Sequence, residues 1–160
     1  MRKGRKKKTI LFLLLSLLAV SFIFWNSTRS VSFSGMESGL FVRIIKPLFD
    51  PKDHIRYELF DTGVRKLAHF VEFAVFGYCL SVFFRGIRWK KPWQSIVVPL
   101  LTLLTAGAVD EVIQIFSVSR GPSVQDVLLD CVGGIFGIAC AKAVHAYRKR
   151  KENAVKNQSL

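Results

Sequence analysis

Ionisable and amide side chains recur inside three otherwise apolar stretches of this chain, and their types and spacing are suited to chemistry. Within each stretch the intervals place them on one face of a helix. An ionisable group in hydrocarbon is costly and normally faces the interior of a helix bundle, where it finds a partner. The three sets are Arg65, His69 and Glu72; Asp110, Glu111 and Gln114; and Ser123, Asp126 and Asp130.

These polar faces are expected to meet in the outer half of a membrane. At 1.5 Å per residue, Glu72 lies roughly 9 Å below the outer end of its helix, and Glu111 lies roughly 13 Å before Arg120. Asp126 and Asp130 begin the last helix at that same surface. The inner halves of the helices contain only one charge. This distribution predicts a polar pocket that opens to the exterior and is closed below.

The carboxyl groups of such a pocket need neutralisation, and a buried salt-bridge network is the simplest way to supply it. Arg65, Lys66 and Arg120 are the nearby cations. The same three residues are candidates to receive the phosphate or carboxylate of a ligand, because Arg and Lys form strong charge-assisted hydrogen bonds to such groups. Asp126 has a further interpretation, since Ser123-x-x-Asp126 resembles a capping box at a helix start.

Two chemical interpretations remain open beside the salt-bridge network. In the first, a divalent cation is bound: imidazole with carboxylate suits zinc or manganese, and several carboxylates suit calcium or magnesium. The His69 to Glu72 spacing is not the zinc-protease pattern with two histidines, so the metal and any other cofactor stay undefined. In the second, the cluster performs acid–base catalysis. The hypothetical catalytic residues are His69, Glu72, Asp110 and Glu111, and the hypothetical binding residues are Arg65, Lys66, Gln114, Arg120, Ser123, Asp126 and Asp130.

The elements that must position these residues are membrane helices. A mean hydropathy of +0.33 combined with a pI near 10.1 requires apolar and basic residues to occupy different parts of the 160-residue chain. A bilayer core of about 30 Å needs about 20 mostly apolar residues. The sequence predicts an all-α bundle of four transmembrane helices, at residues 9–27, 67–85, 94–118 and 125–146. A soluble enzyme is therefore not expected.

The basic residues are best explained as determinants of membrane orientation. Sixteen of the 24 Lys and Arg lie in residues 2–8, in residues 85–91 or from residue 142 onward. The positive-inside rule then places both termini in the cytoplasm. No basic run is interleaved with aromatic residues on a foldable module, so nucleic-acid binding is not expected. Anionic lipid headgroups are the expected partners of these charges.

This topology divides the chain into a basic cytoplasmic N-terminus (1–8), a four-helix membrane domain (9–146) and a basic cytoplasmic tail (147–160). The first apolar run continues to Trp25 without a cleavage site, so we interpret it as an uncleaved signal anchor. Residues 28–66 form one long outer loop, in which residues 40–49 lie along the membrane interface or pack on the helix ends. In the last helix, Gly133, Gly137 and Ala141 form a stripe that lets a neighbouring helix approach closely.

Taken in order, these residues resemble the VanZ-like family of bacterial membrane proteins. The resemblance covers about residues 65–140, and the four-helix layout extends it over most of the chain. One departure is Asp130, where the family pattern favours asparagine. The residues that carry the resemblance are Lys66-x-x-His69, Asp110-Glu111-x-x-Gln114, Arg120-x-x-Ser123-x-x-Asp126, Gly133 and Gly137.

The resemblance implies a multi-pass protein of the bacterial cytoplasmic membrane with a function in the cell envelope. The family takes its name from an accessory protein of glycopeptide-resistance clusters, associated with reduced susceptibility to teicoplanin. It does not supply a reaction, so whether the chain is an enzyme stays open. The expected activity is binding or modification of a lipid-linked envelope component in the outer pocket. The alternative is a non-catalytic scaffold or interaction protein whose polar cluster is structural, and neither reading defines an oligomeric state.

Overall fold

A computed structural model of the chain contains four long helices, and each is long and apolar enough to cross a membrane. The structure describes residues 3–28, 42–50, 54–116 and 123–158. The long helices are α1 (Lys3–Ser27), α3 (Tyr57–Gly86), α4 (Gln94–Ile115) and α5 (Val124–Gln158), and a short helix covers residues 42–49. No strand occurs in the described ranges, so the predicted all-α membrane bundle is confirmed.

Three of the helices extend beyond their predicted spans. Helix α1 starts at Lys3 rather than residue 9, α3 starts at Tyr57 rather than residue 67, and α5 continues to Gln158 rather than residue 146. The segments added to α1 and α5 are polar and rich in Lys and Arg, which are good helix formers, whereas the segment added to α3 mixes polar and apolar residues. In α3 the extension is supported by an ion pair one turn apart, between Asp61 and Arg65.

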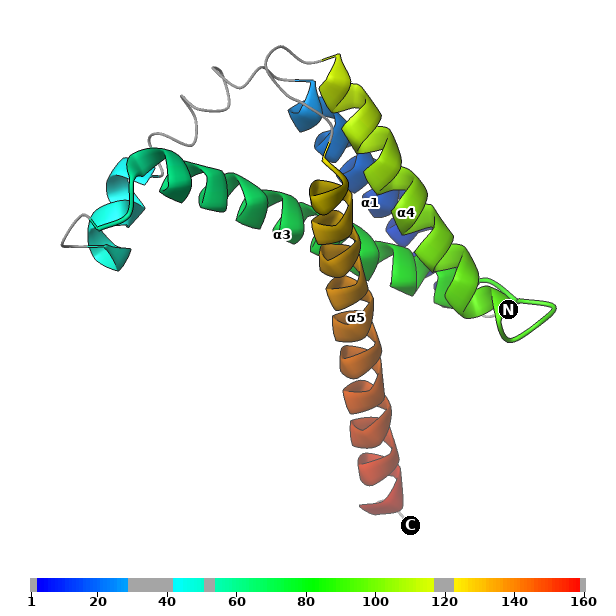
Figure 1. Cartoon of the computed structure of the whole chain (residues 1–160). Coiled ribbons are helices and arrows are strands. Elements are labelled where there is room, and N and C mark those ends of the chain that lie inside the picture. The colour runs from blue at the N-terminus through cyan, green and yellow to red at the C-terminus, as the bar shows by residue number, and fades with distance from the viewer. Residues whose placement is uncertain (1–2, 29–41, 51–53, 117–122, 159–160) are drawn as a thin grey trace.

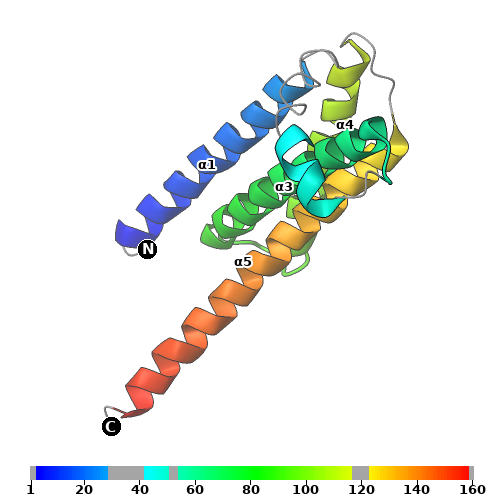
Figure 2. The same cartoon turned by 90° about the vertical axis from the view of Figure 1, so that its left-hand side faces the viewer.

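The helices form a tilted bundle in which α3 packs mainly against α5 and α1. Helix α4 contacts α5, α1 and α3 (Figure 1). At one end of the bundle, Arg5 of α1 donates a hydrogen bond to the carbonyl of Arg85 at 3.4 Å, and Arg85 donates to the carbonyl of Ala141 of α5 at 3.4 Å. The C-terminal part of α5 extends beyond the other helices in both views (Figure 2).

The apolar core is small, and most of the large apolar side chains face outward. Leu18 of α1 is 68% exposed and Phe116 at the end of α4 is 84% exposed. In a bilayer such side chains contact lipid, so their exposure agrees with the four candidate spans. The buried core consists of Ile23, Phe73, Phe76, Leu80, Leu103 and Ala106.

Glycines allow α3 and α5 to cross in close contact. A Cβ atom added at Gly133 would lie 2.5 Å from the carbonyl oxygen of Phe70, and one added at Gly137 would overlap the backbone of Ala74. Gly77 and Gly134 meet in the same way at the crossing. The predicted close-packing role of the glycine stripe on α5 is therefore confirmed, and its partner is α3.

Asp50, the residue after the short helix, is hydrogen-bonded to the two residues His54 and Ile55 that precede α3. Its carboxylate accepts hydrogen bonds from the backbone N–H groups of Ile55, at 2.6 Å, and His54, at 3.0 Å. The hydrogen bond from Ile55 is the main reason why the pKa of Asp50 lies below its ordinary value. Ile44, Leu48 and Phe49 of the short helix are exposed, and its position along the membrane interface stays a prediction.

The crossing of α3 and α5 predicts opposite effects for two glycine-to-alanine substitutions. In Gly137→Ala the new Cβ atom would overlap the backbone of Ala74, so this substitution should destabilise the protein by about 1–3 kcal/mol. Gly63→Ala is the matched control in α3, because nothing lies within 4 Å of its Cβ position. There the better helix propensity of alanine should stabilise by up to about 1 kcal/mol. Unfolding in detergent micelles measures both, and equal effects of the two changes would contradict the close crossing.

The hydrogen bonds of Asp50 predict a pH dependence with a defined sign. Because the folded-state pKa is lowered, the stabilisation by Asp50 is present above the unfolded pKa of about 3.9 and is lost as pH falls through the folded value. NMR titration of the carboxyl carbon should give a pKa below the ordinary value of an aspartate. Asp50→Asn should remove this titration. An ordinary or raised pKa would show that the two backbone hydrogen bonds do not form.

Candidate functional site

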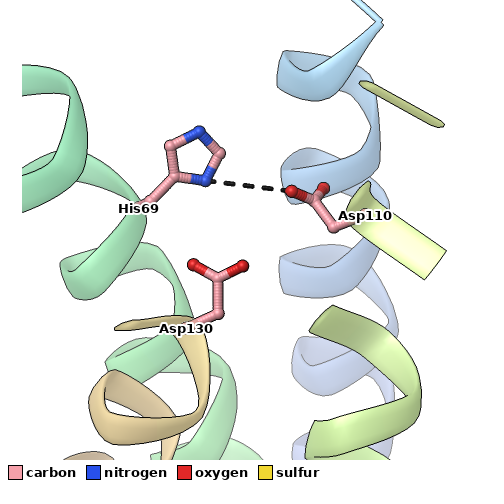
Figure 3. Close-up of side chains that lie close together, drawn as sticks. All are labelled: His69, Asp110 and Asp130. Atoms are coloured by element: carbon pink, nitrogen blue, oxygen red, sulfur yellow. Dashed lines mark ion pairs between the residues drawn. The ribbon is translucent and has the colours of Figure 1, made fainter. Parts of the chain in front are cut away.

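Three ionisable side chains from three different helices meet near one end of the bundle. They are His69 of α3, Asp110 of α4 and Asp130 of α5, and we call them the central cluster (Figure 3). One donor atom from each lies within 4.8 Å of the others. Asp110 is 0% exposed and Asp130 is 2% exposed. The prediction that polar faces from separate helices converge therefore holds for these three residues.

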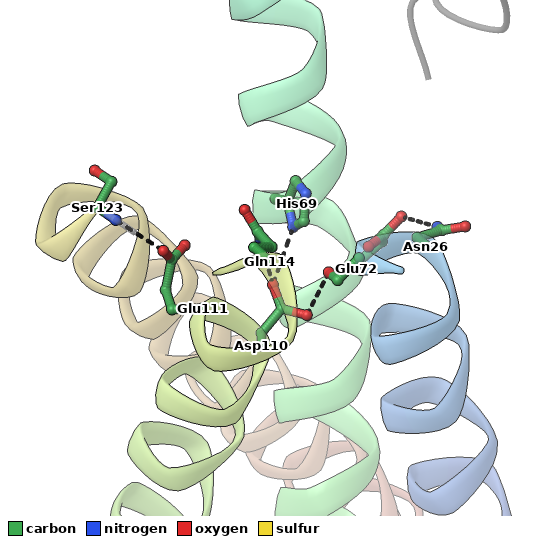
Figure 4. Close-up of polar contacts among 8 residues, drawn as sticks. Asn26, His69, Glu72, Asp110, Glu111, Gln114 and Ser123 are labelled. Carbon is green, nitrogen blue, oxygen red and sulfur yellow. Dashed lines mark hydrogen bonds and ion pairs between the residues drawn. The ribbon is translucent and has the colours of Figure 1, made fainter. Parts of the chain in front are cut away.

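Asp110 is held in place by hydrogen bonds to both of its carboxylate oxygens. Ser27 at the end of α1 donates its hydroxyl to Oδ1, and Gln114, one turn later in α4, donates its amide to Oδ2 at 2.7 Å. His69 Nδ1 lies 4.0 Å from Oδ2, which is an ion pair when the imidazole is protonated (Figure 4). Gln114 therefore lies beside Asp110, as their one-turn spacing predicts, and contacts it directly.

Glu72 lies one turn after His69 and contacts α1 rather than Asp110. Its Oε1 accepts a hydrogen bond from the amide of Asn26 at 2.8 Å (Figure 4). Asn26 and Ser27 are two site residues that sequence reasoning missed. Their signal was present, since both are hydrogen-bonding residues that directly follow the apolar run of the first helix, but that position was interpreted only as the end of a span.

Glu111 points away from His69, toward the start of α5 (Figure 4). Adjacent residues of a helix differ by about 100° in direction, so Glu111 and its neighbour Asp110 reach different partners. The Oε2 atom of Glu111 accepts a hydrogen bond from the backbone N–H of Ser123 at 2.8 Å. Glu111 therefore fixes the beginning of α5 against the end of α4, and the structure does not bring it into the central cluster.

Two of the basic residues that were expected to neutralise the pocket, Lys66 and Arg65, pair with carboxyl groups outside the central cluster. Lys66 Nζ is 2.7 Å from Asp126 Oδ1, and both side chains are partly exposed. Arg65 pairs with Asp61 on its own helix at 2.8 Å. Arg120 lies outside the described residues.

At the centre, no Lys or Arg of the described residues pairs with Asp110 or Asp130. Ion pairs with Lys and Arg therefore neutralise Asp61 and Asp126, but not the carboxyl groups of the central cluster. The physical reason is helix geometry, because Arg65 lies one turn before His69 and its long side chain reaches back along α3 to Asp61. Asp110 instead has His69 as its ionisable neighbour.

Two open cavities lie at the opposite end of the bundle, where the sequence indicated no site. One, of about 470 Å³, lies between α1, α3 and α5, and the other, of about 600 Å³, lies between α3, α4 and α5. Arg85 and His145 border both cavities. The outward-opening pocket predicted around the polar faces stays a prediction.

Comparison with known proteins places these features in a family. The VanZ/LLP1 family matches residues 10–145. The search of curated proteins found no match, and the search of solved structures found none. The matched segment contains the apolar parts of all four long helices and each residue of the central cluster. The chain therefore belongs to the VanZ/LLP1 family.

Proposed function

We propose that this protein binds or chemically alters a lipid-linked component of the bacterial cell envelope, with the central cluster as its site. The observation that carries the proposal is the meeting of His69, Asp110 and Asp130 within 4.8 Å on three membrane helices, with both carboxyl groups buried. Burying ionisable groups in this way is costly, and in membrane helices it commonly marks a functional site. The likeness to VanZ proteins supports a role in the envelope.

His69 is the acid–base group of the proposed site. An imidazole changes its charge near neutral pH, and a neighbouring carboxylate orients the ring and stabilises its protonated form. Asp110 is suited to that orienting role because Ser27 and Gln114 hold its own carboxylate. The partly exposed side chain of His69 gives a ligand access to the ring, whereas Asp110 is fully buried.

Lys66 is the proposed contact for a phosphate or carboxylate of the ligand. Its ion pair with Asp126 is partly exposed on both sides. Exposed pairs of this kind contribute about 0–1 kcal/mol, so an incoming anion displaces Asp126 at little cost. Lys66 lies one turn before His69 on α3, which places the anion contact beside the acid–base group.

The proposed location is the bacterial cytoplasmic membrane, with both termini in the cytoplasm. The N-terminal end of α1 and the C-terminal half of α5 together carry 11 of the 24 Lys and Arg, and positive charge is retained on the cytoplasmic side. The central cluster then lies in the outer half of the membrane, on the side of the cell wall. Reduced susceptibility to a glycopeptide such as teicoplanin is one phenotype that this activity would produce.

A non-catalytic scaffold is the second candidate, and one set of contacts favours it. Hydrogen bonds from Ser27 to Asp110 and from Asn26 to Glu72 join α1 to α4 and α3. Inter-helix hydrogen bonds of this kind fix the positions of membrane helices and need no ligand. In this reading the outer segment between α1 and α3, residues 28–56, engages the partner.

Substitutions in the cluster should remove the function without removing the protein. His69→Ala should reduce activity by about 10²-fold or more, the range expected when a general acid–base group is lost. His145→Ala, an exposed histidine of α5, is the matched control and should retain activity. The measurement is complementation of a deletion strain, with lipid profiling and membrane-protein levels determined in parallel. Full complementation by both His69→Ala and Glu72→Gln, at normal levels, would rule out a chemical role for the cluster.

Replacement of the outer loop distinguishes the two candidates. If the cluster acts on a ligand, exchanging residues 30–49 for an unrelated segment of equal length should leave most activity in the deletion strain. If the protein is a scaffold, that exchange should abolish function, whereas Asp110→Asn should lower only the thermal stability. Activity that survives Asp110→Asn and disappears with the loop exchange is the result that would favour the scaffold.

A further inference from the structure

We infer that the central cluster is a binding site for one divalent transition-metal ion of the zinc or manganese class, with His69, Asp110 and Asp130 as its protein ligands. The three donors come from α3, α4 and α5, so the ion would join three helices at one point (Figure 3). The biological role of this ion rests on the proposed function at the same site, where the ion would take the place of the proton on His69, whereas its binding rests on the geometry of the cluster alone.

The spacing of the donor atoms suits an ion better than direct contact. His69 Nδ1 and Asp110 Oδ2 are 4.0 Å apart, which is too long for a hydrogen bond. Two donors that each lie about 2.1 Å from one ion are roughly 3–4 Å apart. All three donors lie within 4.8 Å of one another, so small side-chain rotations bring them to bonding distance.

The burial and direction of the Asp130 side chain are the strongest indication that the cluster binds a ligand. Its side chain is 2% exposed and points toward His69 and Asp110 (Figure 3). Among the described residues, none forms a hydrogen bond or ion pair with Asp130. A buried carboxyl group without such a partner is costly, and coordination of a metal ion is one of the few ways to satisfy it.

The surroundings of Asp110 resemble the outer shell of a metal ligand. Ser27 and Gln114 each donate a hydrogen bond to one carboxylate oxygen, and each oxygen keeps a further lone pair for an ion. Hydrogen bonds of this kind orient ligating side chains and strengthen metal binding. Both donors come from outside the three ligands, so they would remain in place when the ion binds.

Charge balance and donor type define the class of ion. Two carboxylates carry a charge of −2, and a neutral imidazole adds none, so a dication makes the buried site neutral without Lys or Arg. One nitrogen and several oxygen donors suit zinc or manganese, whereas calcium and magnesium prefer oxygen donors alone. The competing arrangement is a proton shared among the three groups, which needs no metal.

Metal content of the purified protein tests the inference. The full chain in detergent micelles is loaded with zinc or manganese chloride, separated from free metal and analysed by mass spectrometry, and bound manganese is also followed by electron paramagnetic resonance. We expect one ion per wild-type chain and none in Asp130→Asn or His69→Ala. Asp61→Asn and His145→Ala are the matched controls, since Asp61 pairs with Arg65 and His145 is exposed, and both should keep the ion.

A positioning variant adds a graded test. Gln114→Ala leaves all three ligands and should weaken binding about 10–100-fold, the usual effect of removing an outer-shell hydrogen bond. The inference is overturned if the wild-type protein binds neither zinc nor manganese, a result that does not depend on whether any variant folds. It is also overturned if Asp130→Asn, with wild-type helical content, binds as tightly as the wild type.

The two proposals fail in different ways. Loss of complementation in His69→Ala without any metal in the wild-type protein would overturn the metal site and leave an acid–base site supported by a shared proton. One bound ion together with full complementation by variants that have lost it would support the metal site and overturn the proposed function.

Discussion

The structure depends on one constraint: a polar group buried between membrane helices must find its partners within the protein. Asp110 meets it with two hydrogen bonds, from Ser27 and Gln114, and with His69 nearby. These contacts draw three helices to one point, because the partners come from α1, α3 and α4 itself. The carboxyl of Asp110 thus organises the bundle in a region where apolar packing gives little orientation, since lipid tails are as apolar as the helix surfaces.

The crossing of α3 and α5 brings Asp130 to this point. Gly133 lies almost one turn after Asp130 and packs on the carbonyl of Phe70, the residue that follows His69. One position of close backbone approach is thus adjacent in sequence to two members of the central cluster. Side chains larger than hydrogen at this crossing would separate the helices and move the carboxyl group of Asp130 away from the imidazole. The glycines therefore act on the site by setting the distance between helices.

Much of this arrangement could be predicted from the sequence, because a membrane imposes simple rules. Apolar runs fixed the existence of four helices, and three- and four-residue intervals placed His69, Asp110 and Asp130 on facing sides. Helix ends were predicted less well, because hydropathy indicates which residues lie in the bilayer and not where the helix itself begins or ends. The partners of individual side chains were the hardest feature to predict. Arg65 pairs with Asp61, and Glu111 binds the backbone of Ser123, because of side-chain directions that residue spacing alone does not determine.

Helix α5 is continuous from Asp130 to Gln158, a length of about 42 Å at 1.5 Å per residue. The contacts with α3 extend from Gly133 to the carbonyl of Ala141, so they divide α5 into a short segment that contains Asp130 and a long segment that protrudes. Because the helix is continuous, a tilt of the charged, protruding segment would also change the position of the carboxyl of Asp130.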